Sequence, residues 1–178
     1  MTTKTGITAG TYERMLFGPG AVSIDDVPLG ATKGGNTLEI IRTFRDIRPD
    51  GAKGKVKNFR YLESVECILT VRLMEVVEEY IVYALAGSSL STHVITGGEI
   101  VAATYLATVQ LDAEMKGVTA TNENAEVEVE LTNCLVEGPF VLNLPESGES
   151  IIELKFHAHY ADTDLTTEPW TITFTPAS

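Results

Sequence analysis

The sequence predicts a mostly β protein, a sandwich or barrel of two packed sheets with one flanking α-helix and a long protruding hairpin loop. Val, Ile and Thr dominate most segments, and turn residues interrupt these segments at short intervals. One stretch stands out for helical periodicity. The 178 residues suffice for one well-buried core and are too few for two, so we expect a single domain over 1–178.

The first elements follow from turn residues and from alternation. Residues 1–12 hold Thr and Gly without periodicity, and we expect them to be a flexible N-terminal arm that orders on assembly. Strands are predicted at 21–24, between a Gly-Pro-Gly and an Asp-Asp turn, and at 38–44. The clean alternation of 63–73 indicates a half-buried strand.

A basic segment separates the last two of these strands. Seven of the 13 Lys and Arg residues lie within 42–60, with two Asp beside them, so the segment carries +5 and the rest of the chain −17. Pro49-Asp50-Gly51 is a strong β-turn signal, which predicts a protruding hairpin or loop over 42–60. A basic arm on an acidic body can dock head-to-tail onto a second copy, and such contacts propagate into rings or filaments. The candidate docking residues are Arg42, Arg45, Arg48, Lys53, Lys55, Lys57 and Arg60.

An α-helix is predicted over 74–86. Glutamates lie in its first turns, where they suit the helix dipole, and Gly87 is a suitable C-terminal cap. The apolar face of this helix consists of Val77, Tyr80, Ile81 and Leu85.

The rest of the chain is predicted to form strands, at 99–109, 109–116, 125–136, 150–161 and 169–175. The clearest alternation puts Glu126, Glu128 and Glu130 on one face of a strand and apolar residues on the other. Such a face is usually a solvated outer surface. The alternative is that copies of this strand line a space in which polyanions must not bind.

The cysteines and histidines give weak signals for a site. Cys67, one of only two cysteines, shares the apolar parity of its strand, which favours a buried free thiol over a disulfide, ligand or nucleophile. His157 and His159 have a spacing compatible with metal ligation. No Cys or third His lies nearby in the sequence, so a half-exposed strand pair is the better interpretation.

Two further motifs fail as sites. Residues 30–37 resemble a phosphate loop but lack its Gly-Lys-Ser/Thr ending, and a strand follows them instead of a helix N-terminus. Asp162, Asp164 and Glu168 lack the glycine and the spacing of a calcium loop. No nucleophile and base can be paired by spacing. We therefore expect no catalytic residue, no metal and no cofactor, and the protein is not predicted to be an enzyme.

The net charge of −12 limits the partners. A negative surface repels phosphate, which argues against a nucleic-acid-binding body but not against a protein that encloses DNA without gripping it. No apolar run is long enough to span a bilayer, so we expect no membrane partner. The first residues lack the apolar stretch of a secretory signal, so we expect the protein to act where it is made.

Several motifs together resemble one family. They are Phe17-Gly-Pro-Gly-Ala21, Leu29-Gly-Ala-Thr-Lys-Gly-Gly-Asn-Thr37, Arg45-Asp-Ile47, Asp50-Gly-Ala-Lys-Gly54, the acidic-apolar helix before Gly87, Phe156-His-Ala-His159 and Glu168-Pro-Trp-Thr-Ile172. Over nearly its whole length the chain resembles the major tail tube proteins of long-tailed bacteriophages. Type VI secretion tubes and contractile-tail inner tubes share their architecture.

The resemblance implies a virion structural protein. Members of that family assemble as hexameric rings, which stack into the hollow tail tube through which the genome passes. The implied partners are further copies of the chain, the tape-measure protein, and tail tip or terminator proteins, with DNA enclosed but not specifically bound. Assembly would occur in the host cytoplasm, and the product would be part of the virion tail. The resemblance also implies that 42–60 reaches the next ring and favours a lumen-facing position for Glu126, Glu128 and Glu130.

Two alternatives stay open. An Ig-like β binding module would use the basic hairpin to bind nucleic acid or an acidic partner. Only Phe44, Phe59 and Tyr61 flank the segment, which is few aromatic residues for a single-strand binder. A tail terminator or adaptor ring would share the fold without the open-ended stacking.

Overall fold

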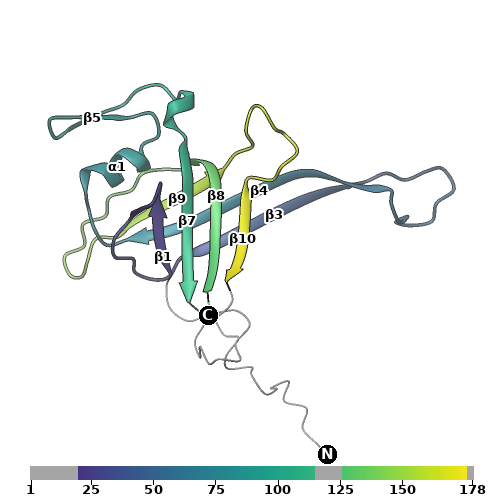
Figure 1. Cartoon of the computed structure of the whole chain (residues 1–178), viewed down its shortest axis with the longest axis horizontal. Helices are drawn as coiled ribbons and strands as arrows, with labels where there is room; N and C mark the ends of the chain where they lie inside the picture. The colour runs from purple at the N-terminus through teal and green to yellow at the C-terminus, as the bar shows by residue number, and fades with distance from the viewer. Residues whose placement is uncertain (1–19, 115–125, 176–178) are drawn as a thin grey trace, which may run out of the picture.

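The computed structural model describes residues 20–114 and 126–175 (Figure 1). The arm expected at 1–12 and the end of the strand expected at 109–116 lie outside these ranges. Within them, no helix is long and apolar enough to cross a membrane. The elements are β1 (Ala21–Ile24), β2 (Val27–Pro28), β3 (Thr37–Asp46), β4 (Arg60–Leu73), α1 (Glu78–Ala84), β5 (Ser89–Ser91), β6 (Val94–Thr96), a 3-10 turn (Ala102–Thr104), β7 (Leu106–Glu114), β8 (Glu126–Val136), β9 (Ile152–Ala158) and β10 (Trp170–Thr175).

Eight of the described strands join one antiparallel sheet. Its order is β2-β1-β7-β8-β9-β4-β3, and β10 also pairs with β8. One edge of β8 is shared, because residues 126–131 pair with β10 and residues 134–136 pair with β9. From this branch point the strands take two directions, and in Figure 1 β1, β7, β8 and β10 run across β3, β4 and β9. The prediction of a mostly β fold with one helix is confirmed, but the sheet is open and does not close into a barrel.

The two sets of strands share one hydrophobic core. Val109 of β7 and Leu131 of β8 belong to the same buried cluster as Leu69 of β4 and Phe156 of β9. All four side chains are completely buried. Burial of a side chain of this size contributes about 1.5–3 kcal/mol, so this cluster is the main source of stability. Ala84 attaches α1 to the same cluster.

Strands β3 and β4 form a hairpin that projects far beyond the rest of the molecule (Figure 1). Its pairing runs from Thr37 opposite Thr70 out to Asp46 opposite Arg60, with a bulge after Thr43. Among the described strands, β9 flanks β4 only over Ile68–Leu73, so the outer part of the hairpin has no neighbouring strand. The predicted protruding hairpin is therefore confirmed.

The helix is shorter than the predicted 74–86. The N–H of Met74 donates to the carbonyl of Ala31 at 3.0 Å, and the N–H of Ala31 donates to the carboxylate of Glu75 at 3.0 Å. These contacts keep the chain extended through Val77, after which α1 begins. The cause is a contact between residues 44 apart in the sequence, which local periodicity does not report.

The strand predicted at 99–109 is correct only from Leu106 onward. Residues 102–104 form a 3-10 turn, and a single strand, β7, follows from Leu106. The β5–β6 hairpin was not predicted at all. The segments before and after this hairpin approach each other closely at Gly87. Its φ is +80°, and a Cβ on it would lie 2.8 Å from the carbonyl oxygen of Glu99. Only glycine permits that approach.

Candidate assembly surface

The tip of the hairpin has a defined shape. The N–H of Ala52 donates to the carbonyl of Pro49 at 3.1 Å and closes a β-turn. Gly51, the third residue of this turn, has a φ of +86°, which glycine adopts without strain. The N–H of Ile47 donates to the carbonyl of Phe59 at 2.7 Å and continues the hairpin beyond β3. The turn predicted at Pro49-Asp50-Gly51 is confirmed.

Arg42 lies at the base of the hairpin and is held within the chain. Its Nη2 lies 2.9 Å from Oε1 and 2.7 Å from Oε2 of Glu168. Its guanidinium also lies over the ring of Trp170, 5.6 Å from the centroid, and Nε1 of Trp170 donates to Oε2 of Glu168 at 2.8 Å. Because this contact joins β3 to the start of β10, it fixes the base of the hairpin against the body.

Two further bases are paired farther out along the hairpin. Nζ of Lys55 lies 3.1 Å from Oδ2 of Asp46, and Nε of Arg60 lies 3.3 Å from Oδ1 of the same carboxylate. The guanidinium of Arg60 also lies 4.3 Å from the ring centroid of Phe44. These contacts tie the tip to the two strands below it.

The other four predicted docking residues carry the uncompensated charge. They form no ion pair with any described residue, and all four are exposed: Arg45, Arg48, Lys53 and Lys57. The structure therefore divides the seven candidates into three that shape the hairpin and four whose charge is available to a partner.

The hairpin also exposes apolar side chains. Ile47 is 53% exposed and Phe59 is 42% exposed, although their backbones are hydrogen-bonded to each other. The full set of large exposed apolar residues on the hairpin is Ile41, Phe44, Ile47, Val56, Phe59, Tyr61 and Leu62. A mixed apolar and basic arm that makes few contacts with its own body is typical of an interface element.

Strand β8 carries an acidic outer face, as the alternation predicts. Val127, Val129 and Leu131 are buried, while Glu126, Glu128 and Glu130 point away from the core. Glu128 lies opposite Asp112 on β7 and opposite Thr173 on β10. Within the described residues no base forms an ion pair with the three glutamates. Like charges opposite each other destabilise a sheet, so a function beyond folding would explain this face.

Both members of the predicted histidine pair, His157 and His159, lie near the carboxylate of Glu137. Nε2 of His159 lies 3.2 Å from Oε1 of Glu137, and Nδ1 of His157 lies 4.0 Å from Oε2. His159 also contacts the carbonyl of Asn133 and packs edge-on against Tyr105. Among the described residues no group of three His, Cys, Asp or Glu could hold a metal ion. The pair links the end of β8 to β9.

The two cysteines are buried free thiols, as predicted for Cys67. Burial, together with the charge of Glu168, raises the pKa of Cys67 from 9.0 to about 11. Burial, together with the influence of Cys67 and Asp25, raises the pKa of Cys134 to about 12. Both thiols are therefore protonated at neutral pH and poor nucleophiles.

The two rejected motifs have structural roles. The carboxylate of Asp164 accepts hydrogen bonds from the backbone and hydroxyl groups of Thr166 and Thr167, which hold its pKa far below the usual value and close the loop before β10. The backbone N–H of Ala31, in the glycine-rich stretch, binds the carboxylate of Glu75. Asp164, Glu168 and the N–H of Ala31 are thus already bonded within the chain.

Comparison with known proteins adds no family. No protein-family model matches the chain, and no curated protein matches it at a significant level.

The sequence missed Glu168 and Trp170 as partners of the hairpin. Glu168 lies 126 residues from Arg42, and the sequence marked it only as a possible calcium ligand and as part of the Glu168–Ile172 motif. The exposed apolar residues could have been found, because Ile47, Val56 and Phe59 interrupt the basic run itself.

Proposed function

We propose that this protein is a virion structural protein, the subunit of a phage tail tube. In this proposal the chain forms hexameric rings that stack into a hollow tube for DNA delivery. The two crossing sets of strands are then the two packed sheets of a sandwich. The tape-measure protein and tail tip or terminator proteins are further partners. Assembly takes place in the host cytoplasm, and the tube is part of the virion.

The observation that carries the proposal is the protruding hairpin. It presents four bases without an ion pair to any described residue, together with exposed apolar side chains such as Ile47 and Phe59. A lone chain gains little from such an arm, because the arm buries little apolar surface. A second copy supplies both the acidic surface and the apolar contact that the arm lacks. Since exposed pairs contribute only about 0–1 kcal/mol each, apolar contact would supply most of the docking energy and charge would supply the register.

The acidic face of β8 supports the tube in particular. Glu126, Glu128 and Glu130 lie on a face without described ion pairs. In a tube, this face would line the lumen and repel DNA phosphates, so that the genome slides without sticking.

The free edge of β10 supports lateral contact within a ring. Among the described strands β10 pairs only with β8, and its Phe174 and Ile172 are 53% and 39% exposed. An open edge beside apolar side chains is a site at which another copy can pair. Rings and stacks would then use different surfaces of the same chain.

Electron microscopy of a charge-reversed variant tests the proposal. Purified, concentrated wild-type protein is expected to form rings or hollow tubes in negative stain, and fewer of them at high salt. The variant Arg45→Glu, Lys53→Glu, Lys57→Glu should stay folded but fail to stack. Lys55 is left intact because it already pairs with Asp46.

The matched control keeps the charge at the same positions, with Arg45→Lys, Lys53→Arg and Lys57→Arg. Tubes of normal length from the charge-reversed variant would show that electrostatic docking of the hairpin is wrong. Monomers of the wild type that bind DNA, with an affinity that falls steeply with salt, would favour the binding-module alternative.

A further inference from the structure

The end of the molecule opposite the hairpin is rich in acids, although Lys33 also reaches it and pairs with Glu149. In Figure 1 the hairpin tip lies at one end of the longest axis, and α1, β5 and the loop between β8 and β9 lie at the other. Residues 74–101 and 137–151 make up much of that end and contain no Lys or Arg. Their seven acids are Glu75, Glu78, Glu79, Glu99, Glu137, Glu146 and Glu149. A basic arm and an acidic end on one long axis are what a head-to-tail contact requires.

Three of these acids carry a charge that no described residue compensates. Glu79, Glu99 and Glu146 are exposed and form no ion pair or side-chain hydrogen bond with a described residue. The others are engaged, for example Glu78 with His93 and Glu149 with Lys33. The unpaired acids at this end thus match the unpaired bases of the hairpin in sign and roughly in number.

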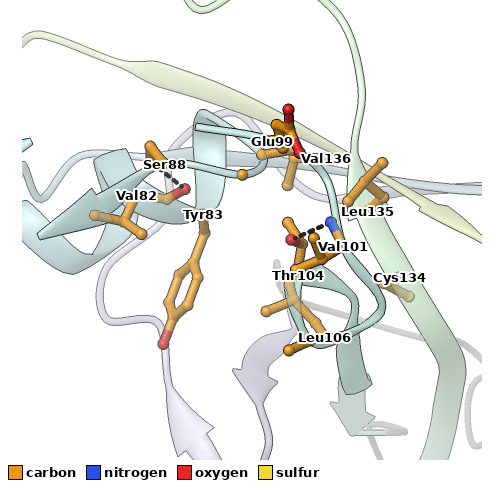
Figure 2. A pocket seen from close by; sticks show the side chains of 13 residues that line it. Val82, Tyr83, Ser88, Glu99, Val101, Thr104, Leu106, Cys134, Leu135 and Val136 are labelled. Atoms are coloured by element: carbon orange, nitrogen blue, oxygen red, sulfur yellow. Dashed lines mark hydrogen bonds between the residues drawn. The ribbon is translucent and has the colours of Figure 1, made fainter. Parts of the chain in front are cut away.

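An apolar cavity lies at this end of the molecule, with Glu99 in its lining. It has a volume of about 310 Å³ and lies between α1, the 3-10 turn and the end of β8 (Figure 2). Val82 and Tyr83 come from α1, and Val101, Leu106 and Val136 line the other side. Glu99 is the one charged side chain among the described residues that line it. The cavity therefore combines mostly apolar walls with one carboxylate, that of Glu99.

Two polar groups of the cavity, the hydroxyl of Ser88 and the N–H of Val101, are already bonded within the chain. Figure 2 shows the hydroxyl of Ser88 donating to the carbonyl of Val82 at 3.3 Å, and the N–H of Val101 donating to the hydroxyl of Thr104 at 3.0 Å. A polar ligand would have to displace these bonds, whereas an apolar side chain would not. The site therefore suits an apolar occupant with basic residues beside it.

We propose that this cavity receives the hairpin tip of a second copy of the chain. Ile47 and Phe59 enter the apolar space, and Arg48, Lys53 and Lys57 face Glu99 and the other unpaired glutamates of this end. The inference rests on the proposed head-to-tail stacking and names the surface that receives the arm. Apolar contact supplies affinity, while the charges fix orientation and exclude other registers.

Engineered disulfides test this contact directly. The variant Ile47→Cys, Val101→Cys carries one new thiol on the tip and one at the cavity, both at positions about half exposed in the wild type. Under mild oxidation it should form a ladder of covalent dimers, trimers and longer chains on a non-reducing gel. A mixture of the two single variants should stop at dimers, because each chain then has one reactive end. Neither single variant alone should cross-link.

The control pair is Ile47→Cys, Leu165→Cys, in which the second thiol lies on an exposed loop outside the acidic end. Docking raises the effective concentration of the paired thiols, so the ladder should form about tenfold faster than in this control or more. A ladder no faster than the control would overturn the inference.

Electron microscopy of the same samples separates the two proposals. Tubes without the ladder would leave the tube function standing and remove the cavity as the receiving surface. A ladder without rings or tubes would support the docking contact and contradict the tube.

Discussion

The β3–β4 hairpin has two halves with the same strand structure but opposite environments. The inner half includes residues 65–73 of β4, and the outer half includes residues 60–64 and the tip. In the inner half, β4 alternates between buried and partly exposed residues, and Cys67, Leu69 and Val71 reach the core. In the outer half every residue of 60–64 is exposed, including the apolar Tyr61 and Leu62. The inner half is explained by the folding of one chain. The outer half is apolar without being buried, and a single chain gives no reason for that.

A bulge and a set of side-chain contacts mark the boundary between the two halves. The bulge after Thr43 puts Leu62 opposite Phe44 and Arg60 opposite Asp46. Arg42, Glu168 and Trp170 join the hairpin to β10 at this point. A long arm held firmly at its base loses less conformational freedom on docking than a loose one, which increases affinity without new contacts.

The largest expected difference between the halves concerns two phenylalanines. Phe156→Ala, beside the inner half on β9, should lower the free energy of unfolding by about 3–5 kcal/mol, because it leaves a cavity in the core. Phe59→Ala, at the exposed tip, should change it by less than about 0.5 kcal/mol. Urea denaturation followed by the fluorescence of the single tryptophan, Trp170, measures both.

The same Phe59→Ala variant should assemble poorly although its fold is unchanged. If Phe59→Ala destabilised the isolated subunit as strongly as Phe156→Ala, the tip would be packed within its own chain. The contrast between the two halves would then be wrong.

A smaller effect is expected at the boundary. Arg42→Ala removes the contact with Glu168 and Trp170, and because Arg42 is partly exposed the loss should be only about 1 kcal/mol. Arg45→Ala, three residues farther along β3, should cost almost nothing, since Arg45 pairs with no described residue.

Trp170 reports on this boundary independently of stability. Its fluorescence in the native state should change in Arg42→Ala and stay as in the wild type in Arg45→Ala. A double-mutant cycle with Glu168→Ala gives the coupling energy between the two side chains. A coupling energy of zero would mean that Arg42 and Glu168 do not hold the base of the hairpin.

The sequence could predict those features whose determining residues are close together in the chain. The strands at 63–73 and 125–136 were found because one buried face imposes a period of two on the residues themselves. The hairpin was found because Pro49, Asp50 and Gly51 encode its turn locally. In both cases the determining residues are neighbours in the chain.

The errors come from distant contacts. The start of α1 depends on Ala31, and the base of the hairpin depends on Glu168, so no local window contains either cause. The cavity at the acidic end is assembled from α1, residues 99–106 and the end of β8, so no local pattern in the sequence indicates it. Figure 1 places the basic hairpin tip and α1, which begins with two glutamates, at opposite ends of the molecule, an arrangement that residue counts do not reveal.

The next comparison concerns the reactivity of thiols at two positions on β4. Cys67 in the inner half is buried, and its raised pKa keeps the thiol protonated, so it should resist Ellman's reagent at pH 8 until the protein is unfolded in urea. A thiol introduced by Leu62→Cys in the outer half should react at once in the native protein. Equal rates for the two thiols would mean that the inner half opens readily, since reaction at Cys67 requires exposure.

The pH dependence of the free energy of unfolding should also differ between the two positions. The pKa of Cys67 is raised in the folded state, from 9.0 to about 11, so its contribution to stability is complete below pH 9. The contribution is lost as the pH rises from 9 towards 11, because the unfolded chain ionises first. Cys67→Ala should therefore show a shallower fall in the free energy of unfolding over this range than the wild type. Leu62→Cys should leave the slope unchanged, since a solvent-exposed thiol ionises alike in both states.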